Sequence, residues 1–389
     1  MRKLLARPWR EYGATKREWD DWRWQMKNRM VRIEDFRRRF SLCPEEEEGI
    51  AFSERKGGGE GGNGMGGGGG GFGAGLTPYF ASLMDPEDPD CPLRRQFIPR
   101  AEEARPSPAD FPDPLGEEDL SPAPAVIHRY PDRVLFLASN VCSSYCRYCN
   151  RKRMVGDPER AVTAAQWEEG LAYVASNPAI RDVLVSGGDP LTLSDGRLLG
   201  LLGRLRAIPH VEILRIGTRV PITLPQRVTP ALVRGLKRIH PLFVSLHVVH
   251  PKELAPEVER ACARLADAGI PVGSQSVLLA GINDDEETLR TLMHRLLRLR
   301  VRPYYLFQCD QIEGTAHFRT PLQKGIDLMK TLIGRTSGYA VPKFAVDLSG
   351  GGGKVPLLPE YREASEDGHI IFRNFAGERF EYLDDLGDA

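Results

Sequence analysis

Residues 134–150 of the chain read VLFLASNVCSSYCRYCN, an apolar strand candidate followed at once by three cysteines. In the segment Cys142-Ser-Ser-Tyr-Cys146-Arg-Tyr-Cys149 the thiols recur at intervals of four and three residues, so all three can converge on one soft metal centre. A structural zinc site requires four protein ligands that close its coordination shell, and no fourth Cys or His lies within a few residues. A four-iron, four-sulfur cluster held by three thiolates instead keeps one iron open for another molecule. From the residues alone two alternatives stay open: incidental cysteines, or a zinc site that borrows Cys309 or a distant histidine.

The run 134–140 is the first of several short apolar runs that alternate with amphipathic stretches. Near-continuous apolar strands, each followed by a helix, are typical of a parallel sheet covered by helices. The expected strands are 134–140, 182–188, 213–219, 243–249, 271–281 and 302–310. The expected helices are 163–177, 194–207, 230–239, 252–268, 284–298 and 321–337.

Polar side chains at the strand ends decide between the two arrangements that this pattern allows, a doubly wound sheet and a barrel. Functional groups at the carboxyl end of nearly every strand favour a barrel or partial barrel, whose active site lies on that rim. These groups are Ser186–Asp189, Arg219, His247, Gln275 and Asp310. We therefore predict an α/β fold with a barrel-like sheet.

Composition divides the chain into five expected regions. The run GGGEGGNGMGGGGGGFGAGL contains too few side chains to pack a core and predicts a flexible insertion. A phosphate-cradling loop is the alternative, but no strand precedes the run and no GK[ST] follows it. The regions are a helical N-terminal region (1–56), the Gly-rich insertion (57–76), a Pro/Asp-rich segment wrapped over another surface (77–126), the barrel (127–340) and a C-terminal cofactor-binding segment with the tail (341–389).

Charge and hydropathy exclude several classes of protein. The 389 residues hold 53 Lys plus Arg and 53 Asp plus Glu, so no global field attracts nucleic acid or an anionic membrane. No apolar stretch approaches the roughly 20 residues that span a bilayer, and the basic N-terminus lacks the apolar core of a secretory signal. The seven cysteines are an odd, sparse count that argues against a disulfide framework. We expect a cytoplasmic enzyme with no nucleic-acid or membrane partner.

A second candidate site is the stretch Asp347-Leu-Ser-Gly-Gly-Gly-Gly-Lys354-Val-Pro. Four glycines allow the backbone to approach a bulky anionic cofactor, and Lys354 can form a Schiff base with an aldehyde. Read alone, the stretch is better explained as a surface turn that carries a solvated lysine.

The CxxxCxxC motif in the first β-α loop resembles the radical S-adenosylmethionine superfamily, whose fold is a partial (β/α)6 TIM-like barrel. In that family the open iron binds S-adenosylmethionine, and an electron from the cluster cleaves it to methionine and a 5′-deoxyadenosyl radical. Residues Ser186-Gly187-Gly188-Asp189 resemble the glycine motif of the family, whose backbone approaches the methionine amino group. Its place after the cysteines makes the resemblance specific.

The resemblance to one family of this superfamily, the lysine 2,3-aminomutases, extends from DDWRWQMKNR (20–29) to about residue 382, interrupted by the glycine run. It is carried by NVCSSYCRYCNRKRMVG, DVLVSGGDPL, RIGTRVPITLPQRVT, AGIPVGSQSVLLAGIND, VRPYYLFQCD, HFRTP, TSGYAVPKFAVD and GGGGKVPLLPEY. The family is dependent on pyridoxal phosphate and moves the α-amino group of its substrate from carbon 2 to carbon 3. In the implied mechanism, the deoxyadenosyl radical removes hydrogen from carbon 3, nitrogen migrates through a three-membered ring, and hydrogen is then returned.

The resemblance also implies residue roles. Cys142, Cys146 and Cys149 hold the cluster; Lys354 holds pyridoxal phosphate; Arg151 grips the substrate carboxylate; Asp310 and Asp347 hold the distal ammonium of lysine; His247 and Gln275 contact S-adenosylmethionine; and Arg129 and Arg133 bind the phosphate or phenolate of pyridoxal phosphate. For the last four residues a purely structural role remains an alternative.

Two aspartates suit a substrate with a positive side chain, because a buried ammonium needs compensating carboxylates. We therefore expect interconversion of L-α-lysine and L-β-lysine. The alternatives are glutamate, arginine, a lysine destined for protein modification, or a degenerate member without turnover. The expected partners are the free amino acid, an electron donor such as flavodoxin or ferredoxin, and a second copy of the chain. Clostridial-type relatives carry C-terminal cysteines that bind an interfacial metal, whereas this chain has none after Cys309.

Overall fold

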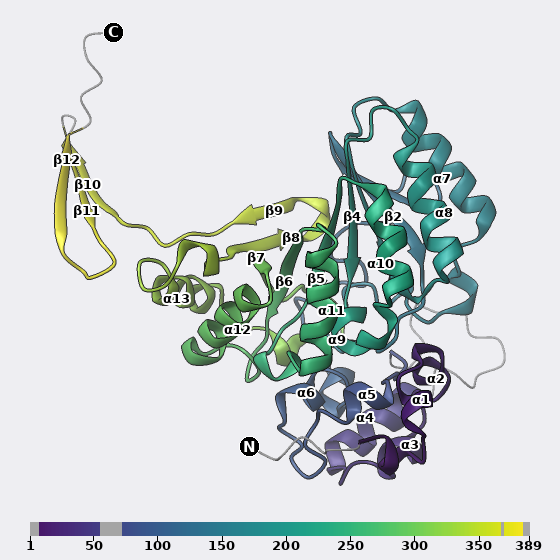
Figure 1. The fold of residues 1–389 in the computed structure, drawn as a ribbon. Helices are drawn as coiled ribbons and strands as arrows, with labels where there is room; N and C mark the ends of the chain where they lie inside the picture. Colours follow the sequence, from purple (N-terminus) through teal and green to yellow (C-terminus); the bar gives the residue numbers. More distant parts are fainter. Residues whose placement is uncertain (1–7, 55–71, 367–368, 384–389) are drawn as a thin grey trace.

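The computed structural model describes residues 8–54, 72–366 and 369–383. Its centre is a nine-stranded sheet in the order β1-β2-β3-β4-β5-β6-β7-β8-β9 (Figure 1). Strands β2 to β8 run parallel, and β1 and β9 flank them as antiparallel edge strands. The bounds are β1 Val126–Tyr130, β2 Arg133–Ser139, β3 Asp182–Gly187, β4 Ile213–Thr218, β5 Leu242–His247, β6 Val272–Leu278, β7 Val301–Gln308, β8 Lys343–Leu348 and β9 Gly353–Pro356.

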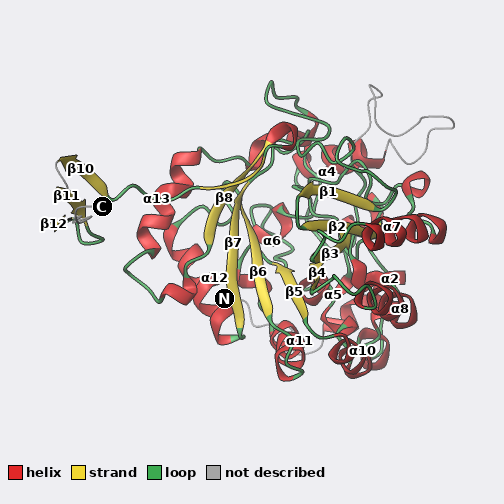
Figure 2. Ribbon diagram, turned by 90° about the horizontal axis from the view of Figure 1, so that it is seen from above, coloured by secondary structure: helices red, strands yellow, loops and turns green. Residues whose placement is uncertain are grey.

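Helices cover the outer side of this sheet. Figure 2 shows the strands along an arc, with α7, α8, α10, α11, α12 and α13 outside it. None of the helices in the described parts of the chain is long and apolar enough to cross a membrane. The bounds are α7 Ala164–Ser176, α8 Asp195–Arg206, α9 Val220–Thr223, α10 Pro230–Leu236, α11 Pro256–Asp267, α12 Glu286–Arg298 and α13 Leu322–Leu332, with 3-10 turns at η3 Pro158–Arg160, η4 Pro190–Thr192, η5 Pro225–Arg227, η6 Lys237–Ile239, η7 Pro251–Glu253, η8 Ala316–Phe318, η9 Gly338–Ala340 and η10 Ser349–Gly351.

Alternation along each strand separates the core from the site. In β3, Val183 and Val185 are fully buried and belong to the core that also contains Leu198 of α8. Leu184 and Ser186 point to the opposite face and remain half-buried. Because successive side chains of a strand point to opposite faces, the concave face of the arc stays available for functional groups.

The predicted α/β partial barrel is confirmed, and all six expected strands and six expected helices are present. One element was missed. The prediction assigned everything after residue 340 to a separate segment, but β8 continues the parallel sheet, with Lys343 opposite Tyr305 of β7. The run KFAVDL is short and begins with an exposed lysine, so its pattern did not indicate a strand.

The N-terminal residues form a layer of short helices against one end of the barrel (Figure 1). Its anchor is a fully buried ion pair in which Arg94 Nη2 lies 2.5 Å from Glu46 Oε2. Arg94 also donates to the carbonyls of Pro86 and Ser41, so the buried charge is compensated on several sides. The elements are η1 Pro8–Tyr12, α1 Lys16–Trp19, α2 Trp22–Lys27, α3 Ile33–Arg37, α4 Pro44–Glu54, α5 Pro78–Ala81, α6 Pro92–Arg95 and η2 Ala101–Ala104.

The Gly-rich run and the segment after it are more structured than predicted where they are described. Residues 57–71 of the predicted insertion lie outside the described residues, but Phe72 stacks on Tyr145 of the cysteine loop. The segment 77–126, expected as an extended wrapping, includes α5, α6 and η2. Its later part lies over the barrel rim, where Gly350 N donates to Pro114 O at 2.9 Å.

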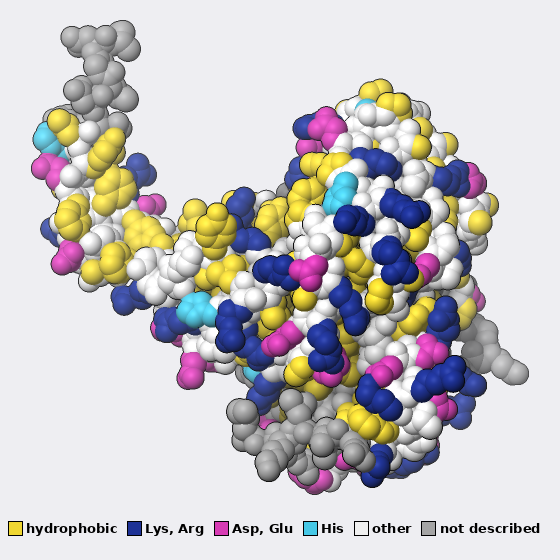
Figure 3. Space-filling view, viewed as in Figure 1, with side chains coloured by type: hydrophobic (Ala, Val, Ile, Leu, Met, Phe, Trp, Pro, Cys, Tyr) yellow, Lys and Arg dark blue, Asp and Glu magenta, His cyan; other side chains and the backbone are white. Residues whose placement is uncertain are grey.

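The C-terminal residues leave the body as an arm, visible at the left of Figure 1. It is a three-stranded antiparallel sheet of β10 Arg362–Glu366, β11 His369–Arg373 and β12 Arg379–Leu383. The arm touches the body where Arg335 Nη2 donates to Phe375 O. Its large apolar side chains are exposed, as Figure 3 shows, and include Leu358, Phe372, Phe375, Phe380, Tyr382 and Leu383.

Candidate active site

The three cysteines lie together in the loop that follows β2. Burial raises the pKa of Cys142, and the nearby Asp189, Cys149 and Cys146 raise it further, so the thiols lie within electrostatic reach of one another. Arg29 fixes the start of the loop by donating from Nη1 to Cys142 O at 2.7 Å. The middle of the loop is tied to preceding segments, since Tyr145 N donates to Gly75 O and Arg147 N to Gln96 O, each at 2.8 Å.

A single metal ion does not fit this loop. Among the described residues, no three His, Cys, Asp or Glu side chains are arranged to hold one ion. The thiolates of a cubane bind different iron atoms and therefore stand farther apart than ligands of one ion. The thiol-only donor set thus fits an iron–sulfur cluster better than the zinc site considered as an alternative.

The predicted glycine motif packs directly beneath the cysteine loop. Gly187 has φ +115°, and a Cβ on it would lie 2.3 Å from Ser139 O. A Cβ on Gly188 would lie 2.6 Å from Val141 O. Both glycines are therefore required for β3 to end against the backbone that leads into the cluster loop. This packing requirement holds whether or not they also contact S-adenosylmethionine.

Asp189 is directed into the protein. Its carboxylate accepts hydrogen bonds from the backbone N of Leu191, Arg219 and Val220 and from Thr218 Oγ1, at 2.7–3.0 Å. Burial raises its pKa to about 6 against these donors. The carboxylate therefore organises the turn after β4. In this structure its oxygens are occupied, and a direct contact with S-adenosylmethionine stays a prediction.

Arg219, at the end of β4, joins this turn to the cluster loop. The residue is 7% exposed, and its Nη1 donates to Cys146 Sγ at 2.8 Å and to Tyr148 Oη. Its Nη2 donates to Gln96 Oε1 at 2.6 Å and to Glu253 Oε2 at 3.1 Å. The sequence placed Arg219 at a strand end without a role.

His247 and Gln275 occupy matching positions on neighbouring strands. They are register partners, but His247 ends β5 whereas Gln275 lies in the middle of β6, so the predicted strand-end position of Gln275 is wrong: β6 begins one residue later than expected and runs on to Leu278. His247 Nε2 lies 2.9 Å from Tyr148 Oη of the cluster loop. Burial, with Arg219 nearby, holds the pKa of His247 well below its ordinary value, so the ring is neutral and one nitrogen can accept.

Lys354 and Asp347 face each other across the hairpin of β8 and β9. They are register partners, and Lys354 Nζ lies 2.8 Å from Asp347 Oδ2. Three of the four glycines make this hairpin possible, because Gly350, Gly351 and Gly353 have φ between +74° and +83°. The turn thus brings Lys354 into direct contact with Asp347, seven residues earlier in the sequence.

Asp347 holds a second cation. Arg129 Nη1 lies 2.7 Å from Asp347 Oδ1, while Arg129 Nε is buried without a partner among the described residues. Asp310 lies nearby: burial and, to a lesser extent, the Asp347 charge raise its pKa to about 6, against a hydrogen bond from Asn150 Nδ2 at 2.9 Å. Two predicted substrate carboxylates and the predicted Schiff-base lysine therefore converge.

Arg151 lies between this cluster of charges and the cysteines, since its charge interacts with both Cys149 and Asp310. Its guanidinium is clamped by Glu117, which accepts from Nη2 at 2.6 Å and from Nε at 3.1 Å. Arg153 Nη2 donates to the other oxygen of Glu117 at 3.0 Å. Burial raises the pKa of Glu117, but both arginines outweigh it, and the pKa falls below its ordinary value.

Arg133 stands apart from these contacts. Its guanidinium lies 3.9 Å from the centre of the Tyr130 ring and pairs with Asp132 at 2.8 Å. The side chain is 40% exposed. Tyr130 in turn accepts a hydrogen bond from Lys354 N, so Arg133 flanks the lysine through an aromatic ring.

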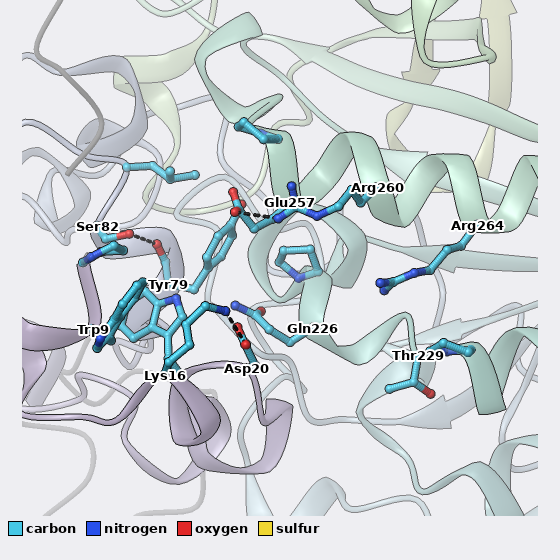
Figure 4. Close-up of a pocket in the computed structure, with 16 residues that line it drawn as sticks. Trp9, Lys16, Asp20, Tyr79, Ser82, Gln226, Thr229, Glu257, Arg260 and Arg264 are labelled. Atoms are coloured by element: carbon cyan, nitrogen blue, oxygen red, sulfur yellow. Dashed lines mark hydrogen bonds and ion pairs between the residues drawn. The ribbon is translucent and has the colours of Figure 1, made fainter. Parts of the chain in front are cut away.

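A cleft of about 520 Å³ lies elsewhere, between the N-terminal helices and the outer helices of the barrel (Figure 4). Its walls include Trp9 and Tyr79, the ion pair of Lys16 with Asp20, and Arg264. None of the predicted site residues lines it.

Comparison with known proteins adds the decisive observation. An L-lysine 2,3-aminomutase of Fusobacterium nucleatum subsp. nucleatum is 46% identical over 365 residues, which cover 94% of this chain and 82% of that protein. The chain belongs to the lysine 2,3-aminomutase family. The family models for lysine-2,3-aminomutase and for the radical SAM superfamily match residues 329–384 and 137–293. Membership makes the chain an isomerase of the radical S-adenosylmethionine type, with a four-iron, four-sulfur cluster and S-adenosylmethionine as cofactors.

The lysine 2,3-aminomutase family includes more than one substrate. An L-lysine 2,3-aminomutase of Clostridium subterminale is 46% identical over 360 residues, covering 92% of this chain and 83% of that protein. A glutamate 2,3-aminomutase of Clostridioides difficile is 38% identical over 373 residues, covering 96% and 85%. Family membership alone therefore leaves the substrate to be argued from the site.

Proposed function

We propose that this enzyme interconverts L-α-lysine and L-β-lysine by moving the α-amino group from carbon 2 to carbon 3, with pyridoxal phosphate on Lys354. The observation that carries the proposal is the convergence of two carboxylates, Asp310 and Asp347, beside Lys354. A buried site with two acids stabilises an ammonium and repels a carboxylate.

The cysteine loop has the donors for the cluster. Cys142, Cys146 and Cys149 would ligate three irons, and the cluster with S-adenosylmethionine supplies the radical that abstracts hydrogen. Close to it, His247 is neutral and Arg219 donates to Cys146. Their burial keeps water and stray hydrogen donors away from the reacting atoms.

The Lys354 hairpin fits an aldehyde cofactor. Pyridoxal phosphate supplies an aldehyde carbon for a covalent bond with Lys354 Nζ and an electron sink for the migrating nitrogen. Arg129 offers an unpaired, buried Nε, and Arg133 a half-exposed guanidinium, as phosphate or phenolate partners. With Nζ held by the cofactor, Asp347 Oδ2 would be available for an ammonium, while Oδ1 would stay paired with Arg129.

Arg151 is suited to the substrate carboxylate. Glu117 occupies Nε and Nη2, and no described residue is assigned as a hydrogen-bond partner of Nη1. A guanidinium held on one side presents its remaining N–H groups in a fixed direction, which favours recognition of a carboxylate. Arg151 would thus fix one end of the substrate and the two aspartates the other.

Product analysis tests the proposal. Enzyme with reconstituted cluster is incubated under anaerobic, reducing conditions with lysine, glutamate or arginine, and products are separated by mass spectrometry. We expect β-lysine from lysine and little product from the other two. Preference for glutamate, or turnover of none of the three, would overturn the lysine assignment.

Replacing Asp310 by Asn should nearly abolish lysine turnover. Loss of one carboxylate leaves the substrate ammonium half-paired, at an expected loss of roughly 3–5 kcal/mol, or about two to four powers of ten in kcat/KM. Cluster and pyridoxal phosphate content should stay at wild-type levels. Normal lysine turnover by both Asp310→Asn and Asp347→Asn would contradict the assignment.

The pH profile gives an independent check on Asp310. Its pKa of about 6 means that the carboxylate is ionised above pH 6 and protonated below it. Because the ionised form is required to hold an ammonium, kcat/KM should fall as pH decreases through about 6. Asp189 has a pKa of about 6 as well, so the Asp310→Asn profile is the control. An acid limb of unchanged midpoint in that variant would assign the limb to another group.

Replacing Glu117 by Gln should raise KM for lysine about 10- to 100-fold, or roughly 1.4–2.8 kcal/mol, with a smaller effect on kcat. The amide cannot hold Arg151 and Arg153 together, so Arg151 loses its orientation. Glu118→Gln is the matched control, because Glu118 is 60% exposed and contacts Arg160 and Arg153. Equal KM values in wild type and Glu117→Gln would show that the clamp is not needed.

The partners and the location also belong to the proposal. We propose a homo-oligomer, supported by the exposed apolar side chains of the C-terminal arm. We further propose a one-electron donor such as flavodoxin or ferredoxin and a cytoplasmic location. Light scattering after size exclusion would test the first, and assembly is contradicted if the chain remains monomeric at micromolar concentration.

A further inference from the structure

We propose that Arg219 is a positioning residue that raises the reduction potential of the iron–sulfur cluster by bonding to one of its thiolates. The observation is direct: Arg219 Nη1 lies 2.8 Å from Cys146 Sγ, inside a site where the arginine is 7% exposed. The inference rests on the cluster and is independent of the substrate assignment.

The guanidinium is held in this direction from several sides. Its backbone N donates to Asp189 Oδ2 at 2.7 Å, which anchors the residue at the start of α9. The Phe97 ring lies 4.5 Å beneath the guanidinium carbon. Gln96 and Glu253 accept from Nη2, so Nη1 remains directed at the sulfur. Such a fixed donor keeps its geometry when the charge on the sulfur changes.

The sign of the effect follows from electrostatics. Reduction adds one electron to the cluster, and a cation that bonds to a ligand sulfur stabilises the reduced state more than the oxidised one. Glu253 partly neutralises Arg219, but it binds Nη2, on the side away from Cys146. The pair therefore presents its positive end to the cluster, and burial strengthens the interaction relative to water.

The test is an EPR-monitored redox titration of reconstituted enzyme, without S-adenosylmethionine or substrate, with dithionite as the one-electron donor. In Arg219→Gln we expect the equilibrium constant for reduction to fall at least tenfold, which corresponds to about 59 mV toward more negative potential. Arg215→Gln is the matched control, because Arg215 lies on β4, the strand that leads to Arg219, but pairs with Asp182 at 2.8 Å. Its potential should equal that of wild type.

If Arg219→Gln does not bind iron, the redox titration is made with Arg219→Lys instead. Lysine keeps the charge but cannot reach Cys146, Gln96 and Glu253 at once, so a smaller shift of the same sign is expected. Unchanged potentials in every loaded Arg219 variant overturn the proposal. The proposal is also overturned if the potential is unchanged and S-adenosylmethionine binding is weakened, because Arg219 would then act on S-adenosylmethionine binding and not on the cluster.

Discussion

Lys354→Arg enzyme is expected to lose lysine turnover by at least about three powers of ten, or roughly 4 kcal/mol of transition-state stabilisation, while it keeps its fold. Arginine retains a cation opposite Asp347, so the ion pair at 2.8 Å has a replacement, but a guanidinium cannot form the covalent bond to pyridoxal phosphate. Lys354→Ala should lose turnover as well, and it also leaves Asp347 with Arg129 as its remaining partner.

Borohydride reduction followed by peptide mapping measures this outcome. Wild-type enzyme should carry the reduced cofactor on Lys354, and neither variant should carry it. Both variants should retain the cluster and reductive cleavage of S-adenosylmethionine, because the cysteines lie in a different loop. Lys343→Ala is the matched control, since Lys343 is exposed at the start of the same hairpin. Label on Lys343 or another lysine in wild type would refute the assignment of Lys354.

Cys146→Ala enzyme is expected to lose both iron and turnover. Reconstituted wild-type protein should bind about four irons and show sulfur-to-iron charge-transfer absorbance at about 400 nm. Two remaining thiolates cannot hold a cubane that retains an open iron, and Arg219 would lose its sulfur acceptor. Cys43→Ala is the control, because Cys43 lies on the N-terminal layer, outside the cluster loop. An iron-loaded, active Cys146→Ala enzyme would end the radical interpretation.

The sequence predicted the fold well because the barrel is encoded by local periodicity. Each β-α unit carries its own apolar run and its own capped helix, such as α7, where Thr163 and Gln166 form a capping box. The short strands β8 and β9 at one edge of the sheet could not be predicted from local periodicity. Among the described residues, no α-helix follows β8 or β9, and both strands are placed by pairing with neighbours that are distant in sequence or joined by a glycine turn.

Within the candidate site, the structure brings together several residues that the sequence singled out, whereas the residues that orient them were not predicted. Glu117 was one acid in a Pro/Asp-rich stretch, and nothing in its spacing indicates Arg151, 34 positions later. Arg219 and Gln96 are separated by 123 positions. Such partnerships depend on how loops from different strands meet at the barrel rim, which no single segment encodes. For Asp189 the motif was recognised, but its carboxylate faces a neighbouring turn.

The hairpin that joins Lys354 to Asp347 has a consequence for the order in which ligands enter. The side chain that pairs with Asp347 is that of Lys354, and it carries the same ammonium group as the proposed substrate. An intramolecular competitor acts at an effective concentration in the millimolar range or above, so free lysine would bind poorly while Nζ remains there. Attachment of pyridoxal phosphate to Lys354, as proposed above, would remove the competitor. Cofactor loading would therefore act as a checkpoint, and enzyme without pyridoxal phosphate would not sequester the cell's lysine.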